Sequence, residues 1–147
     1  MTDATPPPPA PRLTRGRFAF FLLLTGLCVL ADLGTKDAIY GPAVDRERRG
    51  ESPLPIIRGF LYVRPVQNAG GVFGLFPGRN YVFILFSATA IGVIFSLLIL
   101  SRKSAETPFL VALGLILGGA LGNFWDRIFF GYVRDFIALT FWPTFNV

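Results

Sequence analysis

The sequence predicts an all-α membrane protein with at least three transmembrane helices, and three observations predict this class. Hydrophobic residues make up 52% of the 147 residues and charged residues 16%, whereas soluble domains carry about 25% charged residues. The apolar residues gather in long uncharged runs, and basic residues flank these runs. Aromatic residues make up 15% of the chain, which suits a lipid-facing surface with anchors at the membrane interface.

The N-terminal segment combines a polar tail with the first apolar run. Residues 1–16 are rich in proline, and we expect a disordered tail there. Three arginines lead into the apolar run, and we expect a helix over residues 17–35, close to the shortest length that spans a bilayer. A cleaved signal peptide is the alternative. A lipoprotein signal needs a small residue before Cys28, but Leu27 stands there, so the membrane helix is preferred.

The second and third helices are predicted at residues 80–101 and 108–128. Residues 81–100 form an uncharged run of twenty residues, the clearest transmembrane signal in the chain. The third run begins at Pro108, a favourable first helical residue. Three glycines at steps of four give this helix a smooth face that another helix can approach closely. They are Gly114, Gly118 and Gly122.

The segment between the first two helices, residues 37–79, is expected to be a loop outside the membrane. It alternates polar and apolar residues, and its β-branched and aromatic positions at residues 56–66 favour short strands. Residues 68–71 form a turn signal between apolar neighbours. We therefore expect a small β element here that lies on the bilayer surface.

Net charge and missing residue types exclude several functions. The net charge of +5 fits contact with anionic lipids better than nucleic-acid binding, because the basic residues flank the apolar runs. The chain has no histidine, which excludes a Ser-His-Asp triad and an HExxH zinc site. Cys28 is the single cysteine, so no intrachain disulfide can form. We expect no metal and no cofactor.

Counting the membrane crossings brings most of the polar residues near helix ends to one membrane face. Placing an Asp in the membrane centre costs about 2.5 to 3.5 kcal/mol, so ionisable residues there are functional candidates. The candidates on this face are Asp32, Lys36, Asn68, Asn123, Asp126, Arg127 and Asp135. Structural ion pairs are the alternative, between Asp32 and Lys36 four residues apart, or between the neighbours Asp126 and Arg127.

Paired carboxylates suggest the chemistry. Two carboxylates that share a site cannot both ionise easily, so one acts as an acid and the other as a base near neutral pH. Such a pair can activate water and protonate a leaving amine, while a nearby amide or guanidinium stabilises the oxyanion. From the residues alone, Asp126 and Asp135 could form the pair.

Five motifs appear in order along the chain: Asp32-Leu-Gly-Thr-Lys36, Asn68-Ala-Gly-Gly-Val-Phe-Gly74, the stretch from Gly118 through Asn123 to Asp126-Arg127, Gly131-Tyr-Val-Arg-Asp135-Phe-Ile137 and Phe145-Asn146-Val147. Each motif alone is weak. Together, from about Arg17 to the last residue, they resemble bacterial lipoprotein signal peptidase, also called signal peptidase II.

This resemblance implies a four-helix bundle in the bacterial inner membrane, with both termini cytoplasmic and a small periplasmic β cradle between helices 1 and 2. Counting positive charges alone leaves that orientation open. The implied activity is removal of signal peptides from diacylglyceryl-modified prolipoproteins, just before the lipidated cysteine. The implied partners are this substrate and membrane lipids, and we expect a monomer without nucleic acid, in which residues 17–147 form the peptidase domain.

The resemblance also implies roles for individual residues. The first catalytic aspartate of the family falls on Asp135. Residues that bind substrate, stabilise the oxyanion or support the site fall on Asp32, Lys36, Asn68, Gly70, Asn123, Asp126, Arg127 and Asn146. The second catalytic aspartate is expected three residues after Asn146, beyond Val147, so we expect the 147 residues to lack it, together with the fourth helix. Leu33 and the pair Gly71-Val72 depart mildly from the family pattern.

Three alternatives remain open. A small transporter or proton-relay subunit could use Asp32, Asp126 and Asp135 as a relay, although no internal repeat supports it. An inactive relative could bind lipidated peptides without cutting them. A Ser-Lys peptidase could use Lys36 with Ser52, although no motif surrounds that serine.

Overall fold

The computed structural model describes residues 13–70, 79–100 and 106–147. In that part of the chain, three helices are long and apolar enough to cross a membrane. They contain α1 (Arg15–Thr35), α3 (Asn80–Leu100) and α4 (Thr107–Phe129), close to the predicted 17–35, 80–101 and 108–128. Residue 101 and residues 1–12 of the predicted tail lie outside the described residues, while Arg15 and Gly16 belong to α1 rather than to a tail.

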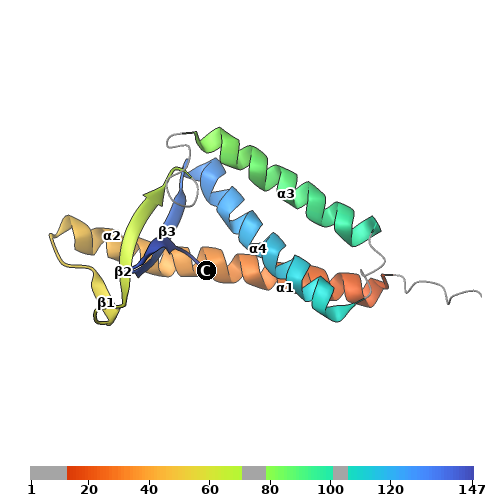
Figure 1. The fold of residues 1–147 in the computed structure, drawn as a ribbon, viewed down its shortest axis with the longest axis horizontal. Coiled ribbons are helices and arrows are strands. Elements are labelled where there is room, and N and C mark those ends of the chain that lie inside the picture. Colours follow the sequence, from red (N-terminus) through yellow and green to blue (C-terminus); the bar gives the residue numbers. More distant parts are fainter. Residues whose placement is uncertain (1–12, 71–78, 101–105) are drawn as a thin grey trace, which may run out of the picture.

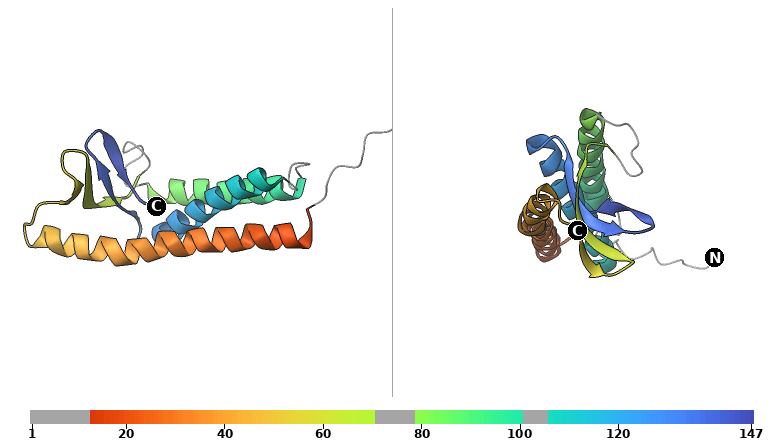
Figure 2. Two further views of the ribbon diagram at one scale, coloured as in Figure 1. Left: turned by 90° about the horizontal axis from the view of Figure 1, so that it is seen from below. Right: turned by 90° about the vertical axis from the view of Figure 1, so that its left-hand side faces the viewer.

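The first helix continues far beyond the predicted end. It runs through one π-helical segment, η1 (Lys36–Tyr40), into α2 (Gly41–Arg48), so the predicted loop of residues 37–79 begins as helix. Pro42 has no N–H to donate to the carbonyl of Ala38, which accounts for the interrupted α-helical ladder at η1. The continuous rod has 34 residues. Its length is therefore about 50 Å, whereas a bilayer core is about 30 Å thick, and Figure 2 shows it reaching past the ends of α3 and α4.

The glycines of α4 form the contact with α1, which confirms the predicted close approach of another helix. A Cβ at Gly122 would overlap the Asp32 carboxylate, and a Cβ at Gly118 would overlap the Cβ of Cys28. At Gly114 the added Cβ would lie 3.1 Å from Leu24 Cδ2. The absence of side chains along this line brings Asp32 directly against the backbone of α4.

An apolar core holds the three long helices together at the end away from the sheet. It consists of Phe21, Ile94, Leu98, Leu110, Leu113 and Leu117. The outer surfaces of the helices are also apolar: Leu30 is 70% exposed and Ile99 is 74% exposed. Exposed aliphatic side chains of this kind on all three helices are expected of a surface that faces lipid.

A four-stranded antiparallel sheet, in the order β1-β2-β3-β4, lies across the rod beside η1 and α2 (Figure 1). Strands β1 (Leu54–Ile57) and β2 (Leu61–Asn68) come from the segment between the first two long helices, as predicted. Strands β3 (Val133–Leu139) and β4 (Trp142–Phe145) follow α4.

The predicted helical class with a small β element is therefore confirmed in outline, but the placement of that element between helices 1 and 2 was incomplete. The structure is mostly helical with a small sheet, and half of that sheet comes from the C-terminal residues. The segment over residues 133–139 has the β-branched and aromatic residues of a strand, but the sequence analysis treated it only as part of a motif. Gly131, with φ 80°, makes the turn that leads from α4 into β3.

Candidate active site

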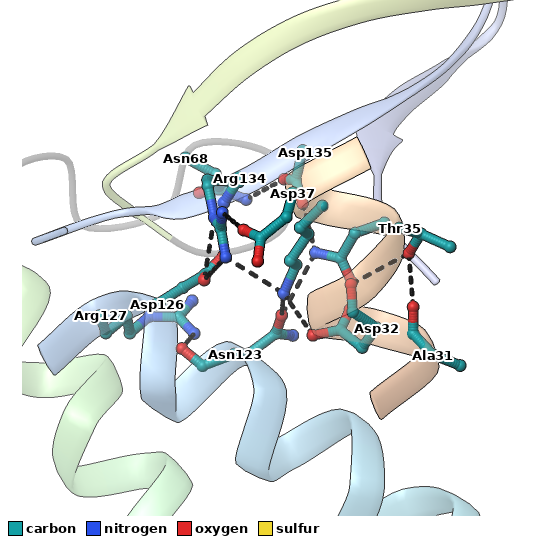
Figure 3. A network of polar contacts seen from close by, with 12 residues as sticks. Ala31, Asp32, Thr35, Asp37, Asn68, Asn123, Asp126, Arg127, Arg134 and Asp135 are labelled. Carbon is teal, nitrogen blue, oxygen red and sulfur yellow. Dashed lines mark hydrogen bonds and ion pairs between the residues drawn. The ribbon is translucent and has the colours of Figure 1, made fainter. Parts of the chain in front are cut away.

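The site lies where the ends of α1 and α4 meet the sheet. Helix α1 and η1 contribute Asp32 and Lys36, and α4 contributes three residues of its last two turns (Figure 3). Strands β2 and β3 contribute Asn68 and Asp135, and Gly70 and Asn146 lie just after the ends of β2 and β4. All nine predicted site residues are described, and hydrogen bonds and ion pairs join them into one group. They are Asp32, Lys36, Asn68, Gly70, Asn123, Asp126, Arg127, Asp135 and Asn146.

Two asparagine amides hold the Asp135 carboxylate. Asn68 Nδ2 donates to Asp135 Oδ2 at 2.9 Å, and Asn146 Nδ2 donates to Oδ1 at 2.6 Å. Burial raises the pKa of Asp135, although both amides and the positive charges of Lys36 and Arg127 oppose the rise. The carboxyl therefore keeps its proton to a higher pH than a free aspartate, which suits a group that must both give and take a proton.

Asn123 links Asp135 to the charged part of the site. Its Oδ1 accepts from Asn146 Nδ2 at 3.2 Å and from Lys36 Nζ at 3.1 Å. Asn146 thus donates to both Asn123 and Asp135. A displacement of Lys36 would therefore move the side chain of Asn123, then that of Asn146, and so disturb the hydrogen bond to the Asp135 carboxylate.

Five side chains of alternating charge form a continuous chain of ion pairs next to the amides of Asn123 and Asn146. In order they are Asp32, Lys36, Asp126, Arg134 and Asp37. Lys36 Nζ lies 2.6 Å from Asp32 Oδ2 and 3.2 Å from Asp126 Oδ2. Arg134 Nη2 lies 2.8 Å from Asp126 Oδ1, and Arg134 Nη1 lies 2.5 Å from Asp37 Oδ1. Lys36 and Asp126 are completely buried, so each charge depends on its partners, because an unpaired buried charge is strongly destabilising.

Asp126 is held by its neighbours on both oxygens. Oδ1 accepts from two guanidinium nitrogens of Arg134, and Oδ2 accepts from the Arg134 backbone N–H at 2.9 Å and faces Lys36. Successive side chains of a strand point to opposite faces, so Arg134 and Asp135 leave β3 in opposite directions. Asp126 therefore lies on the Arg134 side of the strand, and this geometry argues against pairing it with Asp135.

Asp32 and Lys36 form the ion pair that was considered as an alternative, whereas the ion pairs of Asp126 in the described residues are with Lys36 and Arg134. Neighbouring residues on a helix point in different directions, so Arg127 faces other groups. Its Nη2 donates to the Gly70 carbonyl and its Nη1 to the Asn123 carbonyl, each at 3.4 Å. The guanidinium also lies 5.3 Å from the centre of the Phe83 ring.

Gly70 and Asn68 form a short turn at the end of β2. The Gly70 N–H donates to Asn68 Oδ1 at 3.1 Å, which leaves the Asn68 amide nitrogen directed at Asp135. The buried Nε of Arg127 has no hydrogen-bond partner among the described residues. Arg127 therefore keeps one donor, Nε, that no described residue uses.

The geometry argues against a Ser-Lys pair. Lys36 Nζ is buried and already contacts Asp32, Asp126 and Asn123. Ser52 is exposed and lines a pocket of about 380 Å³ between α2 and the β1–β2 hairpin, to which Lys36 does not contribute. Lys36 is thus an ion-pairing residue of the site.

Sequence reasoning missed three residues of the site: Arg134, Asp37 and Asn80. Arg134 and Asp37 end the chain of charges, and Asn80 Nδ2 donates to the Arg127 carbonyl at 3.0 Å. One signal could have revealed Arg134, since it is the only basic residue in the strand that follows Asp126. Asp37 and Asn80 carry no comparable signal, because their partners are 97 and 47 residues away.

Comparisons with known proteins identify the family of the chain. The family model described as "Signal peptidase (SPase) II" matches residues 24–147. This chain belongs to the signal peptidase II family. The lipoprotein signal peptidase of Syntrophomonas wolfei is 41% identical over 122 residues, covering 82% of this chain and 76% of that protein. The one of Streptomyces coelicolor is 38% identical over 146 residues, covering 94% of this chain and 68% of that protein.

Other relatives extend well beyond the matched region. With the lipoprotein signal peptidase of Halothermothrix orenii, 42% identical over 94 residues, the match covers 64% of this chain and 63% of that protein. A bacterial membrane enzyme solved by the in meso method is similar in fold, with a TM-score of 0.71 at 24% identity over 87% of this chain and 77% of that one. Membership of this family favours a peptidase over a transporter or proton-relay subunit.

Proposed function

We propose that this chain removes signal peptides from diacylglyceryl-modified prolipoproteins, cutting just before the lipidated cysteine, and that Asp135 is one of its catalytic residues. One observation supports the role of Asp135 most directly. Its carboxyl is buried at the ends of membrane-type helices, held by two amides and raised in pKa. The family of the chain supports the substrate class.

The chemistry needs a second carboxyl group. In an aspartic peptidase, one carboxylate takes a proton from the attacking water while the other carboxyl protonates the leaving amine. The hydrogen bonds to Asp135 within residues 13–70, 79–100 and 106–147 come from two asparagines, and no acid is among the charges that shift its pKa. We therefore propose that Asp135 works with a second acid that is not among its hydrogen-bonding partners in the described residues.

The groups around Asp135 have distinct tasks in this proposal. Asn68 and Asn146 orient the carboxyl group, and Arg127 with its remaining donor capacity stabilises the negative charge that develops on the scissile carbonyl. Asp32, Lys36 and Asp126 bind no substrate, because each is buried within the ionic chain and supports the site from behind.

The orientation follows from the substrate. A lipidated cysteine keeps its acyl chains in the bilayer, and its peptide bond lies at the membrane surface. We propose that the sheet and the polar site lie at the periplasmic face of the bacterial inner membrane, that the N-terminal end of α1 faces the cytoplasm, and that the enzyme works as a monomer. The position of the polar residues at one end of three lipid-facing helices supports a site at the membrane boundary.

The experiment is to compare Asp135→Asn with wild type in the complete gene product that contains these residues. Asparagine keeps the shape and one acceptor oxygen, so it retains one of the two amide contacts, but it cannot exchange a proton. Cleavage of a diacylated lipobox peptide should therefore fall by at least about 10²-fold. Binding of the same peptide should remain close to wild type. Near wild-type turnover in the variant would refute the role of Asp135, and a wild-type protein that binds the peptide without cutting it would indicate an inactive relative.

A further inference from the structure

We propose that Arg134 is a positioning residue for Asp135: it holds β3 at the rotation that directs the neighbouring carboxyl group toward Asn68 and Asn146. The proposal rests on the proposed peptidase function, in which Asp135 performs chemistry. Arg134 itself would touch neither substrate nor reacting atoms.

Arg134 is held from two directions. On the α4 side, Nε and Nη2 donate to Asp126 Oδ1 at 3.1 and 2.8 Å, and the backbone N–H donates to Oδ2 at 2.9 Å. On the η1 side, Nη1 donates to Asp37 Oδ1 at 2.5 Å. The guanidinium carbon lies 4.4 Å from the centre of the Phe130 ring. Arg134 thus connects β3 by hydrogen bonds to both α4 and η1.

The contacts of Arg134 matter because the pairing of β3 is irregular with both of its neighbouring strands, β2 and β4. The pairing of β2 with β3 shifts register between Val63 and Val66, the latter paired with Asp135. The pairing of β3 with β4 shifts between Ile137 and Leu139. A regular ladder would fix the rotation of the strand by itself, and bulges weaken that restraint. The bonds of Arg134 supply a restraint at the residue adjacent to Asp135.

Because of strand geometry, the contacts of Arg134 also determine the orientation of the Asp135 side chain. Side chains at positions 134 and 135 point to opposite faces, so fixing the backbone N–H and the guanidinium of Arg134 fixes the direction in which Asp135 leaves the strand. The Asp135 oxygens accept at 2.9 and 2.6 Å from the amides of Asn68 in β2 and of Asn146, just after β4. A small rotation of β3 would break one or both contacts.

Asp37 provides a mild way to test the anchor. It is 73% exposed, whereas the Arg134 side chain is 9% exposed, and exposed ion pairs add little to stability. Lys36 and Asp37 are adjacent at the start of η1 and hold the two ends of the Asp126–Arg134 pair. Asp37→Asn therefore weakens one side of the anchor and leaves the buried charges paired.

The test uses Arg134→Lys and Asp37→Asn in the complete gene product, with two matched controls from the exposed ion pair of α2, Arg48→Lys and Asp45→Asn. Lysine keeps the charge but loses the planar group that bonds both acids at once. Cleavage of a diacylated lipobox peptide gives kcat and KM, and hydrogen exchange of residues 130–139 reports the restraint on β3. Size-exclusion chromatography in detergent verifies folding.

We expect Arg134→Lys to lower kcat by about tenfold or more, since misplacing a catalytic group by 1 Å can cost about 10²-fold. KM should stay within about twofold of wild type because Arg134 does not contact substrate. Exchange in β3 should become faster, Asp37→Asn should change kcat and exchange in the same direction by less, and both controls should match wild type.

Three results would overturn the proposal, two of them in the kinetics and one in hydrogen exchange. The first is a wild-type kcat in folded Arg134→Lys and Asp37→Asn, even with faster exchange, since the anchor would then be only structural. The second is a raised KM at unchanged kcat, which would place Arg134 in substrate binding. The third is unchanged exchange, which would show that Arg134 does not restrain β3. A wild-type protein that fails to cleave would instead overturn the peptidase function.

Discussion

The contact between Gly122 and Asp32 gives a sharp test of how the site is built. A methyl group added at Gly122 would overlap the Asp32 carboxylate, whereas one added at Gly119, on the same helix, meets nothing within 4 Å. Both substitutions replace a helix-interior glycine by alanine, which on propensity alone stabilises a helix by about 0.5 to 1 kcal/mol. The two variants therefore share the same backbone effect and differ only in packing.

The two substitutions should change the free energy of unfolding in opposite directions. Gly119→Ala should be neutral or raise the free energy of unfolding by up to about 1 kcal/mol. Gly122→Ala carries an overpacking cost of about 1 to 3 kcal/mol. Asp32 cannot move away freely, because its Oδ2 lies 2.6 Å from the buried Lys36 Nζ, and disrupting a buried pair costs about 3 to 5 kcal/mol. We expect Gly122→Ala to be less stable than Gly119→Ala by about 2 kcal/mol or more.

The assay is equilibrium unfolding in detergent, followed by circular dichroism, with wild type and both variants under one set of conditions. Cleavage activity of the complete gene product serves as a second readout, since moving Asp32 should displace Lys36 and Asn123 as well. Equal stability of the two alanine variants would refute the close helix contact. Lowered stability with unchanged activity would refute the link from that contact to the site.

The remaining predictions concern pH and orientation. The pKa of Asp135 is raised by burial above 3.8, so the folded state binds more protons than the unfolded state and stability falls as pH rises through this window. Asp135→Asn should therefore gain stability relative to wild type between about pH 4 and neutral pH, and equal Tm differences at pH 4 and pH 7 would contradict this. In a Cys28→Ser background, a membrane-impermeant maleimide should label Arg48→Cys but not Arg15→Cys in spheroplasts. The reverse pattern would invert the proposed topology.

The sequence predicted the long helices well because each long apolar run carries its own signal. The uncharged residues 81–100 need no tertiary information to be assigned as a membrane helix. Glycines at steps of four likewise predicted a helix contact, although α1 as the partner became evident only from the structure. Counting the membrane crossings placed seven of the nine predicted site residues on one face, and the family resemblance added Gly70 and Asn146.

The parts that sequence reasoning missed depend on contacts between distant residues. The helix beyond Lys36 was assigned to a loop because its residues are polar and include Pro42, yet a rod that leaves the membrane has no need of an apolar surface. Arg134 was noted only as a neighbour of Asp135, although it is the main partner of Asp126. Which of several adjacent charges pair is decided by the rotation of β3, which no local pattern encodes.

The division of the sheet between two distant segments has a consequence for biogenesis. Strand β2 ends at Asn68, and its partner β3 begins at Val133, after two further long helices. During synthesis, the edge of β2 that pairs with β3 therefore remains unpaired until α3 and α4 have been made. Contacts of such long sequence separation form late and slowly. Asp135 meets Asn68 only at that stage, so a partly inserted chain lacks the assembled carboxyl site. The assembled carboxyl site would thus arise only once the membrane helices are in place.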